Sequence, residues 1–346
     1  MSRDIWNPRQ YRAYSSHRAR PFYELLARVD VEDPAYVVDL GCGPGERTAD
    51  LAARWPSAVV EGIDSSEQMI SEARRMLRAA RAAVEPAGDV VAEEEGGGDA
   101  GSSGRLGAGA EVDTAAADGA VRDVETRITA RAQPAESAVL PADVVGSRPP
   151  RSGQMADANP GGGGSLEFSV GDLAEWAPDR PVDVIFSNAA LQWVPGHQRL
   201  LPRWVEALTP GGRLAFSMPG NFDGPSHTLL RELCESPRWH DRLGEVNRHN
   251  IVDDPAEYYE LLTDLGCDVD AWETTYLQVL HGTDPVLEWM KGTALRPALN
   301  ALAEGEERAD FLAELAPLLR EAYPPGPHGT IFPFRRVFVV AVTPSR

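Results

Sequence analysis

Three aspartates stand where short apolar runs end, in positions from which their side chains could bind one polar ligand. Asp39 lies near the end of the run 36–40, and Asp64 directly follows the run 58–63. Asp172 follows a third apolar run further along the chain. Such runs are typical of buried parallel strands, whose carboxyl ends meet at one edge of a sheet. A carboxylate accepts hydrogen bonds from hydroxyl, amino and ammonium groups. One aspartate alone is more often a solvated turn residue, but three at successive strand ends predict a ligand-binding edge.

A glycine-rich loop follows the first of these aspartates. It contains Gly41, Gly43 and Gly45, and Thr48 then opens a predicted helix. Glycine lets the backbone turn sharply and lets a ligand approach the main chain. The spacing is G-x-G-x-G, whereas dinucleotide-binding loops typically read G-x-G-x-x-G. Asp39 would repel a pyrophosphate but could receive an ammonium group, directly or through water, so the loop favours a ligand other than a dinucleotide.

Arginines form a second group of candidate binding residues. Arg296, Arg335 and Arg336 occur among apolar and aromatic neighbours, where a merely solvated arginine is not expected. Arginine binds carboxylates through a bidentate fork, so these residues suit a ligand with several carboxylates. If the last strand alternates, Arg335 and Arg336 point to opposite faces, and we favour Arg336 as the residue facing the pocket. A salt bridge to one of the surplus acids is the alternative role for each.

Strands and helices alternate around these residues. Residues 183–187 and 213–218 form further apolar runs, the second after a Pro-Gly-Gly turn. Apolar residues recur at helical spacing between the runs, and Ser65 with Gln68 predicts a capping box for the helix that follows Asp64. This alternation predicts a doubly wound α/β fold, in which helices cover both faces of a mostly parallel sheet.

Both ends of the chain are expected to add strands or helices around that sheet. Two β-rich stretches, 269–280 and 330–342, could pair as an antiparallel edge. The segment 284–323 between them has a helical pattern and is predicted to form a substrate cap. Residues 1–30 are predicted to form N-terminal lid helices.

A low-complexity segment interrupts the chain. Residues 81–165 contain no Phe, Tyr or Trp and include runs of glutamate and glycine. Such a segment cannot bury enough apolar surface to offset its backbone entropy, so we expect it to be disordered. It would be a loop insertion between a helix ending near Ala80 and a strand starting at Leu166, where extra length costs little. The main domain then comprises residues 31–80 and 166–346.

Charge and cysteine content argue against several classes of function. The 346-residue chain has a net charge of −20, whereas nucleic-acid and anionic-membrane surfaces need a cationic footprint. No apolar run approaches the roughly 20 residues that span a bilayer, and the first residues lack a signal-peptide core. Three scattered cysteines predict neither a disulfide framework nor a metal site. We therefore expect a cytoplasmic protein without a bound metal, with a monomer favoured.

The strand-end motifs resemble those of the class I S-adenosylmethionine-dependent methyltransferases. Residues 37–45 look like the first motif of that family, and residues 187–193 look like the loop after its fourth strand. The resemblance implies that the first motif and Asn188 bind S-adenosylmethionine, that Asp64 binds its ribose and that Asp172 contacts its adenine. It also implies a seven-stranded sheet whose last strand is antiparallel.

A closer resemblance is to the trans-aconitate methyltransferases within that family, and it skips only the low-complexity segment. The blocks that carry it are Trp6-Asn7-Pro8 with Tyr11, Arg18 and Arg20-Pro21, then 217–221, 286–297 and 332–338. It implies a small tricarboxylate as substrate, bound by Trp193 and by the arginines of the C-terminal blocks. Tyr14 and His17 would close the pocket from the N-terminal segment, with ordinary lid packing as the alternative role for both.

No catalytic side chain is predicted. A carboxylic acid with a pKa of about 4 is ionised at neutral pH, so its oxygen can accept a methyl group without a general base. One alternative keeps the enzyme class but changes the acceptor to another small carboxylic acid or an acyl-carrier thioester. The others are an NAD-dependent oxidoreductase, disfavoured by the glycine spacing and by Asp39, and a methyltransferase-like module that binds the cofactor without turnover.

Overall fold

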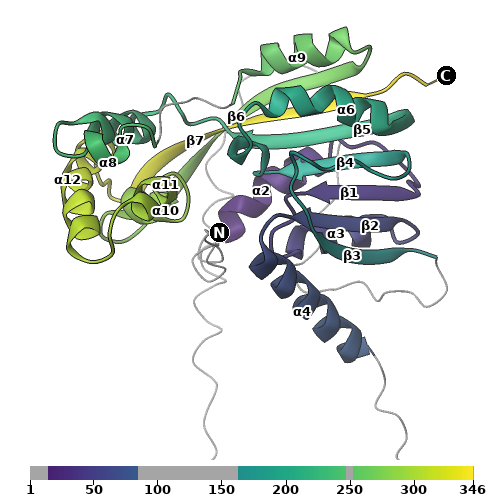
Figure 1. The fold of residues 1–346 in the computed structure, drawn as a ribbon, viewed down its shortest axis with the longest axis horizontal. Helices are drawn as coiled ribbons and strands as arrows, with labels where there is room; N and C mark the ends of the chain where they lie inside the picture. Colours follow the sequence, from purple (N-terminus) through teal and green to yellow (C-terminus); the bar gives the residue numbers. More distant parts are fainter. Residues whose placement is uncertain (1–14, 85–162, 247–251, 346) are drawn as a thin grey trace, which may run out of the picture. The chain divides into compact units, whose positions relative to one another are not determined.

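The computed structural model describes residues 15–84, 163–246 and 252–345, whose strands form one seven-stranded sheet (Figure 1). The strands span Tyr36–Leu40 (β1), Val59–Asp64 (β2), Ser165–Val170 (β3), Val182–Asn188 (β4), Leu208–Pro219 (β5), Asp268–Leu280 (β6) and Thr330–Val342 (β7). Their order in the sheet is β3-β2-β1-β4-β5-β7-β6. The first five strands pair in parallel, and β7 runs antiparallel between β5 and β6.

The predicted doubly wound sheet with an antiparallel last strand is therefore confirmed. All five residues of β1 are buried, as expected for a strand covered on both faces. The predicted antiparallel edge is also confirmed, because β6 and β7 pair along their whole length. β5 begins at Leu208, five residues before its predicted start at Arg213, because Leu208 already pairs with Val182 before the register shifts.

Helices cover both faces of this sheet. They span Ser15–Leu26 (α2), Glu46–Arg54 (α3), Glu67–Val84 (α4), Leu201–Ala207 (α6) and Pro255–Asp264 (α9). Phe22 of α2 and Leu51 of α3 are fully buried in an apolar cluster with one face of β1, β4 and β7. Trp204 of α6 and Tyr258 of α9 are fully buried against the other face. No helix among the described residues is long and apolar enough to cross a membrane.

The start of α4 lies one residue later than the predicted capping box. Ser66 Oγ accepts the backbone N–H of Met69 at 3.3 Å, so Ser66 and not Ser65 is the capping residue. The N–H of Ser66 itself donates to Asp64 Oδ1 at 2.9 Å. This hydrogen bond stabilises the turn after β2, and the helix begins after that turn, one residue later than predicted.

The predicted insertion, residues 81–165, lies almost wholly outside the described residues. α4 continues to Val84, and β3 begins at Ser165, opposite Val59 of β2. Both α4 and β3 lie against β2, so the segment leaves and rejoins the sheet beside the same strand. Its disorder stays a prediction.

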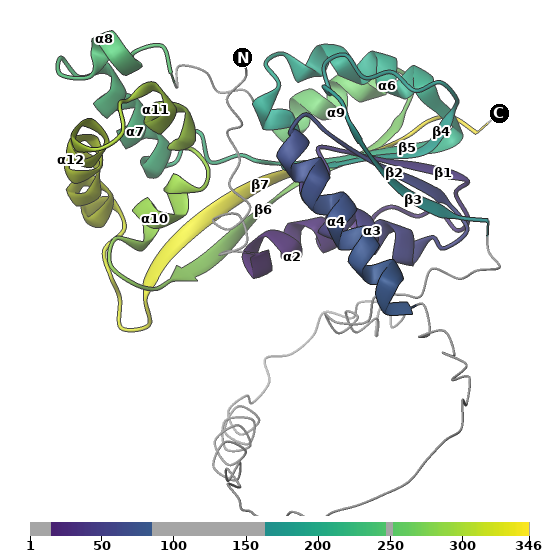
Figure 2. The ribbon, with the colours of Figure 1, turned by 60° about the horizontal axis from the view of Figure 1, so that its bottom comes forward.

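β6 and β7 extend past the other strands and carry a separate group of helices (Figures 1 and 2). These helices span Pro225–Glu235 (α7), His240–Leu243 (α8), Pro285–Lys291 (α10), Arg296–Ala301 (α11) and Glu306–Ala322 (α12). Trp289 and Phe311 are buried in their core together with Phe332 at the far end of β7. The predicted helical segment 284–323 supplies α10 to α12, whereas α7 and α8 are additions that the sequence pattern did not predict.

Candidate functional site

The glycine-rich loop joins β1 to α3 at the carboxyl edge of the sheet. Gly41 donates its N–H to the carbonyl of Ile63 in β2 at 2.7 Å. Gly41, Gly43 and Gly45 have left-handed φ angles of +81°, +56° and +82°. A Cβ at Gly41 would lie 2.1 Å from the Cβ of Ala190, so packing alone requires glycine there. A Cβ at Gly43 would meet no described protein atom within 4 Å.

Asp39 is buried beside this loop, with 3% of its surface exposed. Thr48 of α3 donates its hydroxyl to Asp39 Oδ2 at 2.7 Å. Burial raises the pKa of Asp39 to about 7; the Thr48 hydrogen bond opposes this shift, and the charge of Asp64 adds to it. A cation beside this carboxylate would favour its ionised form. Asp39 is therefore suited to face an ammonium group.

Asp64 fixes the glycine loop and the start of α4 at the same time. Its Oδ2 accepts the N–H of Gly43 at 2.9 Å, and its Oδ1 accepts that of Ser66 at 2.9 Å. Each carboxylate oxygen can accept a further hydrogen bond, so Asp64 can also receive hydroxyl groups. Asp172, after β3, is exposed and accepts the N–H of Ala174 at 2.9 Å. The three predicted carboxylates therefore stand at the ends of three adjacent strands.

A polar group lies where β4 and β5 end. Asn188 Oδ1 accepts hydrogen bonds from Ser217 Oγ at 2.7 Å and from Arg336 Nη2 at 2.9 Å. Arg336 is only 3% exposed, and its register opposite Pro219 places it at the carboxyl end of β5. The structure thus brings one residue predicted for the cofactor into direct contact with one predicted for the substrate.

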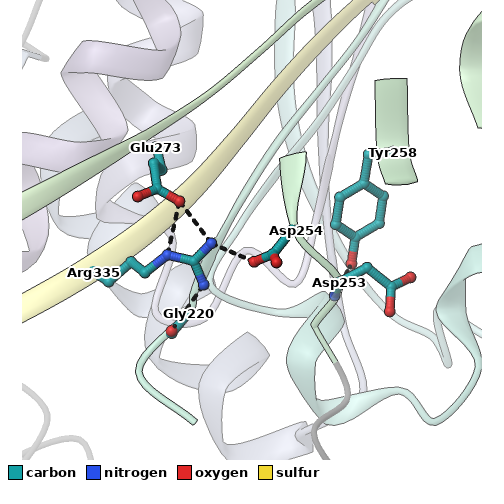
Figure 3. A network of polar contacts seen from close by, with 6 residues as sticks. All are labelled: Gly220, Asp253, Asp254, Tyr258, Glu273 and Arg335. Carbon is teal, nitrogen blue, oxygen red and sulfur yellow. Dashed lines mark hydrogen bonds and ion pairs between the residues drawn. The ribbon is translucent and has the colours of Figure 1, made fainter. Parts of the chain in front are cut away.

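Arg335 lies on the opposite face of β7, where it forms an ion-pair network (Figure 3). Its Nε and Nη2 donate to Glu273 Oε2 at 2.8 and 2.6 Å, and Nη2 also pairs with Asp254. Its Nη1 donates to the carbonyl of Gly220 at 3.2 Å. Because Asp254 is engaged here, its side chain does not cap α9. The structure does not bring Arg335 to the other predicted site residues, and gives it the alternative role of a salt bridge.

Four other predicted substrate residues lie in different parts of the chain. Trp193 ends the short 3₁₀ helix that follows β4 and is 40% exposed. Arg296 is the half-buried first residue of α11. His17 belongs to α2, but its side chain falls outside the described residues, as does Tyr14 altogether. Their roles stay predictions.

Sequence reasoning missed Glu24 of α2, which links this helix to the sheet. Its carboxylate accepts hydrogen bonds from three side chains of β6, those of Trp272, Thr274 and Tyr276. Glu24 is the one acidic residue in the sequence SSHRARPFYELL of α2. A single acid on a helix that packs its apolar face on a sheet was the signal that could have found it.

The groups at the carboxyl edge fit S-adenosylmethionine. The backbone at Gly43 allows close approach, and the buried carboxylate of Asp39 suits an ammonium group. Asp64 and Asp172 offer acceptors for hydroxyl and amino groups at the next two strand ends. A dinucleotide would instead have to place a pyrophosphate against this group of acids.

Relatives with known names are similar to the chain over nearly its full length. A trans-aconitate 2-methyltransferase of Streptomyces avermitilis is 42% identical over 340 residues, which covers 97% of this chain and 96% of the relative. Proteins of the same name from Rhodococcus jostii and Mycobacterium tuberculosis are 42% and 38% identical over 340 residues, with 97% of this chain and 99% and 96% of the relatives covered. A family model described as a methyltransferase domain matches residues 11–271. The chain therefore belongs to the methyltransferase-domain family, within the group of proteins named trans-aconitate 2-methyltransferase.

Proposed function

We propose that this protein transfers a methyl group from S-adenosylmethionine to one carboxylate of trans-aconitate, giving a monomethyl ester and S-adenosylhomocysteine. The observation that carries the proposal is the contact between Arg336 and Asn188. It puts a buried guanidinium beside Asn188, which is predicted to bind S-adenosylmethionine. A buried arginine there suits an acceptor with several negative charges. The names of the relatives support the same acceptor.

The chain's own residues act by positioning. When bound, S-adenosylmethionine supplies an electrophilic methyl group, so an O–CH₃ bond forms as the S–CH₃ bond breaks and the sulfur keeps both electrons. A carboxylic acid with a pKa of about 4 is ionised at neutral pH, so no side chain has to remove a proton. Arg336 holds an acceptor carboxylate in a bidentate fork, while Asn188, itself bonded to Ser217, fixes the guanidinium. Orientation and exclusion of water then supply most of the rate.

We also propose that the protein is a cytoplasmic monomer that acts on a small tricarboxylate and binds no nucleic acid. Its net charge of −20 opposes binding to phosphate backbones and favours separate, mutually repelling monomers. Its three cysteines are buried and free, which suits a reducing compartment.

One assay tests the proposed reaction. The protein is incubated with methyl-labelled S-adenosylmethionine and trans-aconitate, and we expect one labelled, base-labile methyl group per product molecule. A panel of other small carboxylic acids and an acyl-carrier thioester separates the alternative acceptors. Cofactor binding without labelling of any acceptor would make the protein a binding module, and binding of NAD in its place would favour an oxidoreductase.

Gly43→Ala should weaken cofactor binding by roughly 1–3 kcal/mol, because a methyl group would stand where the ligand approaches the backbone. Gly266→Ala is the matched control, since Gly266 has a φ of +84° and a Cβ there would also meet no atom within 4 Å. Both variants lose about 1 kcal/mol of stability to the left-handed backbone. Titration calorimetry compares their affinities for the cofactor. Equal affinities would mean that the ligand does not approach Gly43.

Asp64→Ala should weaken cofactor binding by about 1.5–3 kcal/mol for each charge-assisted hydrogen bond to the ribose that is lost. Asp183→Ala is a suitable control, because Asp183 Oδ2 accepts the N–H groups of Ala35 and Tyr36 at 2.8 and 3.0 Å, at the other end of β1. Both variants lose two backbone partners, so both should have a lower Tm. Only Asp64→Ala should change the dissociation constant. The same loss of affinity in both would assign the effect to the fold and not to the ribose.

A further inference from the structure

One carboxylate fixes the position of α2 against β6. Glu24 accepts hydrogen bonds from Tyr276 Oη at 2.5 Å, from Thr274 Oγ1 at 2.6 Å and from Trp272 Nε1 at 3.3 Å. These three residues alternate along the strand and therefore share one face of it. Burial raises the pKa of Glu24, but the three hydrogen bonds outweigh it and lower that pKa below its usual value. Glu24 is thus a stable anion that sets the register of the helix on the strand.

The residues that Glu24 contacts lie at and beyond the carboxyl edge of the sheet. Arg336 pairs with Pro219, the last residue of β5, and on its other side with Thr274. Tyr276 pairs with Phe334, two residues further along the β6–β7 ribbon toward the cap helices. Arg336 and Tyr276 therefore share the face that α2 covers, with Tyr276 further out. In Figure 2, α2 lies along this part of β6 and β7.

Arg20 stands one helical turn before Glu24 and lies over the aromatic ring of Tyr276. Its guanidinium carbon is 4.9 Å from the ring centroid. The side chain is exposed, and it forms no ion pair within 4.0 Å with any other residue that the structure describes. A guanidinium stacked on a ring keeps its N–H donors free at its edge, where they can bind a carboxylate.

A second arginine, Arg28, makes the same kind of stacking contact four residues earlier on β6, but its charge is paired with an acid. The guanidinium carbon of Arg28 is 4.7 Å from the ring centroid of Trp272, and its Nη1 pairs with Asp270 at 2.5 Å. The two arginines therefore make the same aromatic contact. Of the two, only Arg20 lies on the side of the carboxyl edge. The one acid on its own helix is Glu24, and that carboxylate already accepts three hydrogen bonds from β6.

We infer that Arg20 binds a carboxylate of the acceptor that is not methylated and, together with Arg336 on the same face of the β6–β7 ribbon, selects acceptors with several carboxylates. This inference rests on the proposed function. Arg20 stacks on the ring of Tyr276, and Arg336 pairs in register with Thr274 on the same face of the β6–β7 ribbon. Arg20 therefore adds a second cation to the face that carries Arg336. A protein with a net charge of −20 needs such a local excess to hold a polyanion.

The test compares Arg20→Met with Arg28→Met, which remove the same charge and the same stacking contact. Both variants should keep the cofactor dissociation constant and stay folded, as a thermal melt will show. For trans-aconitate we expect Arg20→Met to raise KM roughly 10- to 100-fold, the range for a lost charge-assisted hydrogen bond. Arg28→Met should change KM by no more than about twofold, as for an exposed pair. Arg20→Lys should fall between Arg20→Met and the wild type.

Dicarboxylate analogues, each lacking one carboxylate of trans-aconitate, show whether the contact is direct. The analogue without the carboxylate bound by Arg20 should have the same KM with the wild type and with Arg20→Met, because the partner is missing in both. If the wild type methylates trans-aconitate and Arg20→Met has an unchanged KM, the inference alone is wrong. Equal increases for Arg20→Met and Arg28→Met would also overturn it, by assigning the effect to lost charge or helix docking. If the wild type does not methylate trans-aconitate, the proposed function fails and this inference fails with it.

Discussion

Replacing Arg336 by Met should raise KM for trans-aconitate far more than replacing Arg335 by Met, although the two residues are neighbours in β7. Arg336 is buried at the carboxyl edge and contacts Asn188, so its loss should cost roughly 2–5 kcal/mol of acceptor binding. Arg335 lies on the other face, with its charge already paired with Glu273 and Asp254. Its loss should leave KM within about threefold of the wild type and reduce stability by at most about 1 kcal/mol per pair.

The pair of variants separates a local contact from general electrostatics. Each removes one positive charge from adjacent positions, so long-range attraction of the trianion falls by a similar amount in both. Steady-state kinetics at saturating cofactor give KM and kcat, and calorimetry gives the cofactor affinity, which should change little in either variant. Similar KM values for Arg335→Met and Arg336→Met would refute the carboxylate role of Arg336. The substrate proposal would then rest on the relatives alone.

The sequence was sufficient to predict the strands and the strand-end carboxylates, because these depend on local patterns. The short run 36–40, apolar except for Asp39, is expected to be buried on both faces, and β1 is found at that run. Alternation alone predicted that Arg335 and Arg336 would separate to opposite faces. The predicted start of α4 was wrong by one residue. Asp64 accepts the N–H of Ser66, so Ser66 belongs to the end of the turn after β2 and the helix begins after it.

Contacts between distant parts of the chain could not be predicted. Arg335 pairs with carboxylates 62 and 81 residues away, and no local pattern distinguishes these from the many other acids. Glu24 and Tyr276 are 252 residues apart and meet only because α2 packs beneath β6 and β7. Such long-range pairings decide how many N–H donors of each arginine remain available to bind a ligand. Sequence reasoning therefore found the arginines but could not predict which acids Arg335 pairs with or that Arg20 stacks on Tyr276.

Cofactor affinity should rise with pH between 5.5 and 7.5, because Asp39 must be ionised to receive an ammonium group. Burial raises the pKa of Asp39 to about 7 in the free protein, well above the value of about 3.9 in an unfolded chain. If only the ionised form binds, the apparent dissociation constant equals the intrinsic one divided by the ionised fraction, which grows roughly 25-fold over this interval. Above pH 7.5 the rise should level off. Calorimetry without acceptor measures this directly, and binding below pH 7 should release a proton.

The same carboxylate should make the free protein less stable as pH rises. The folded state keeps the Asp39 proton at a higher pH than the unfolded state does, so its stabilising contribution is full below about pH 4 and is lost as pH passes through about 7. Asp39→Asn stays neutral and should remove both trends, binding the cofactor weakly but with the same affinity at pH 5.5 and 7.5. It keeps an oxygen that can accept the hydrogen bond from Thr48, so the fold should survive. A wild-type dissociation constant that is independent of pH would contradict the ionisation of Asp39 on binding. A pH dependence that persists in Asp39→Asn would assign it to another group.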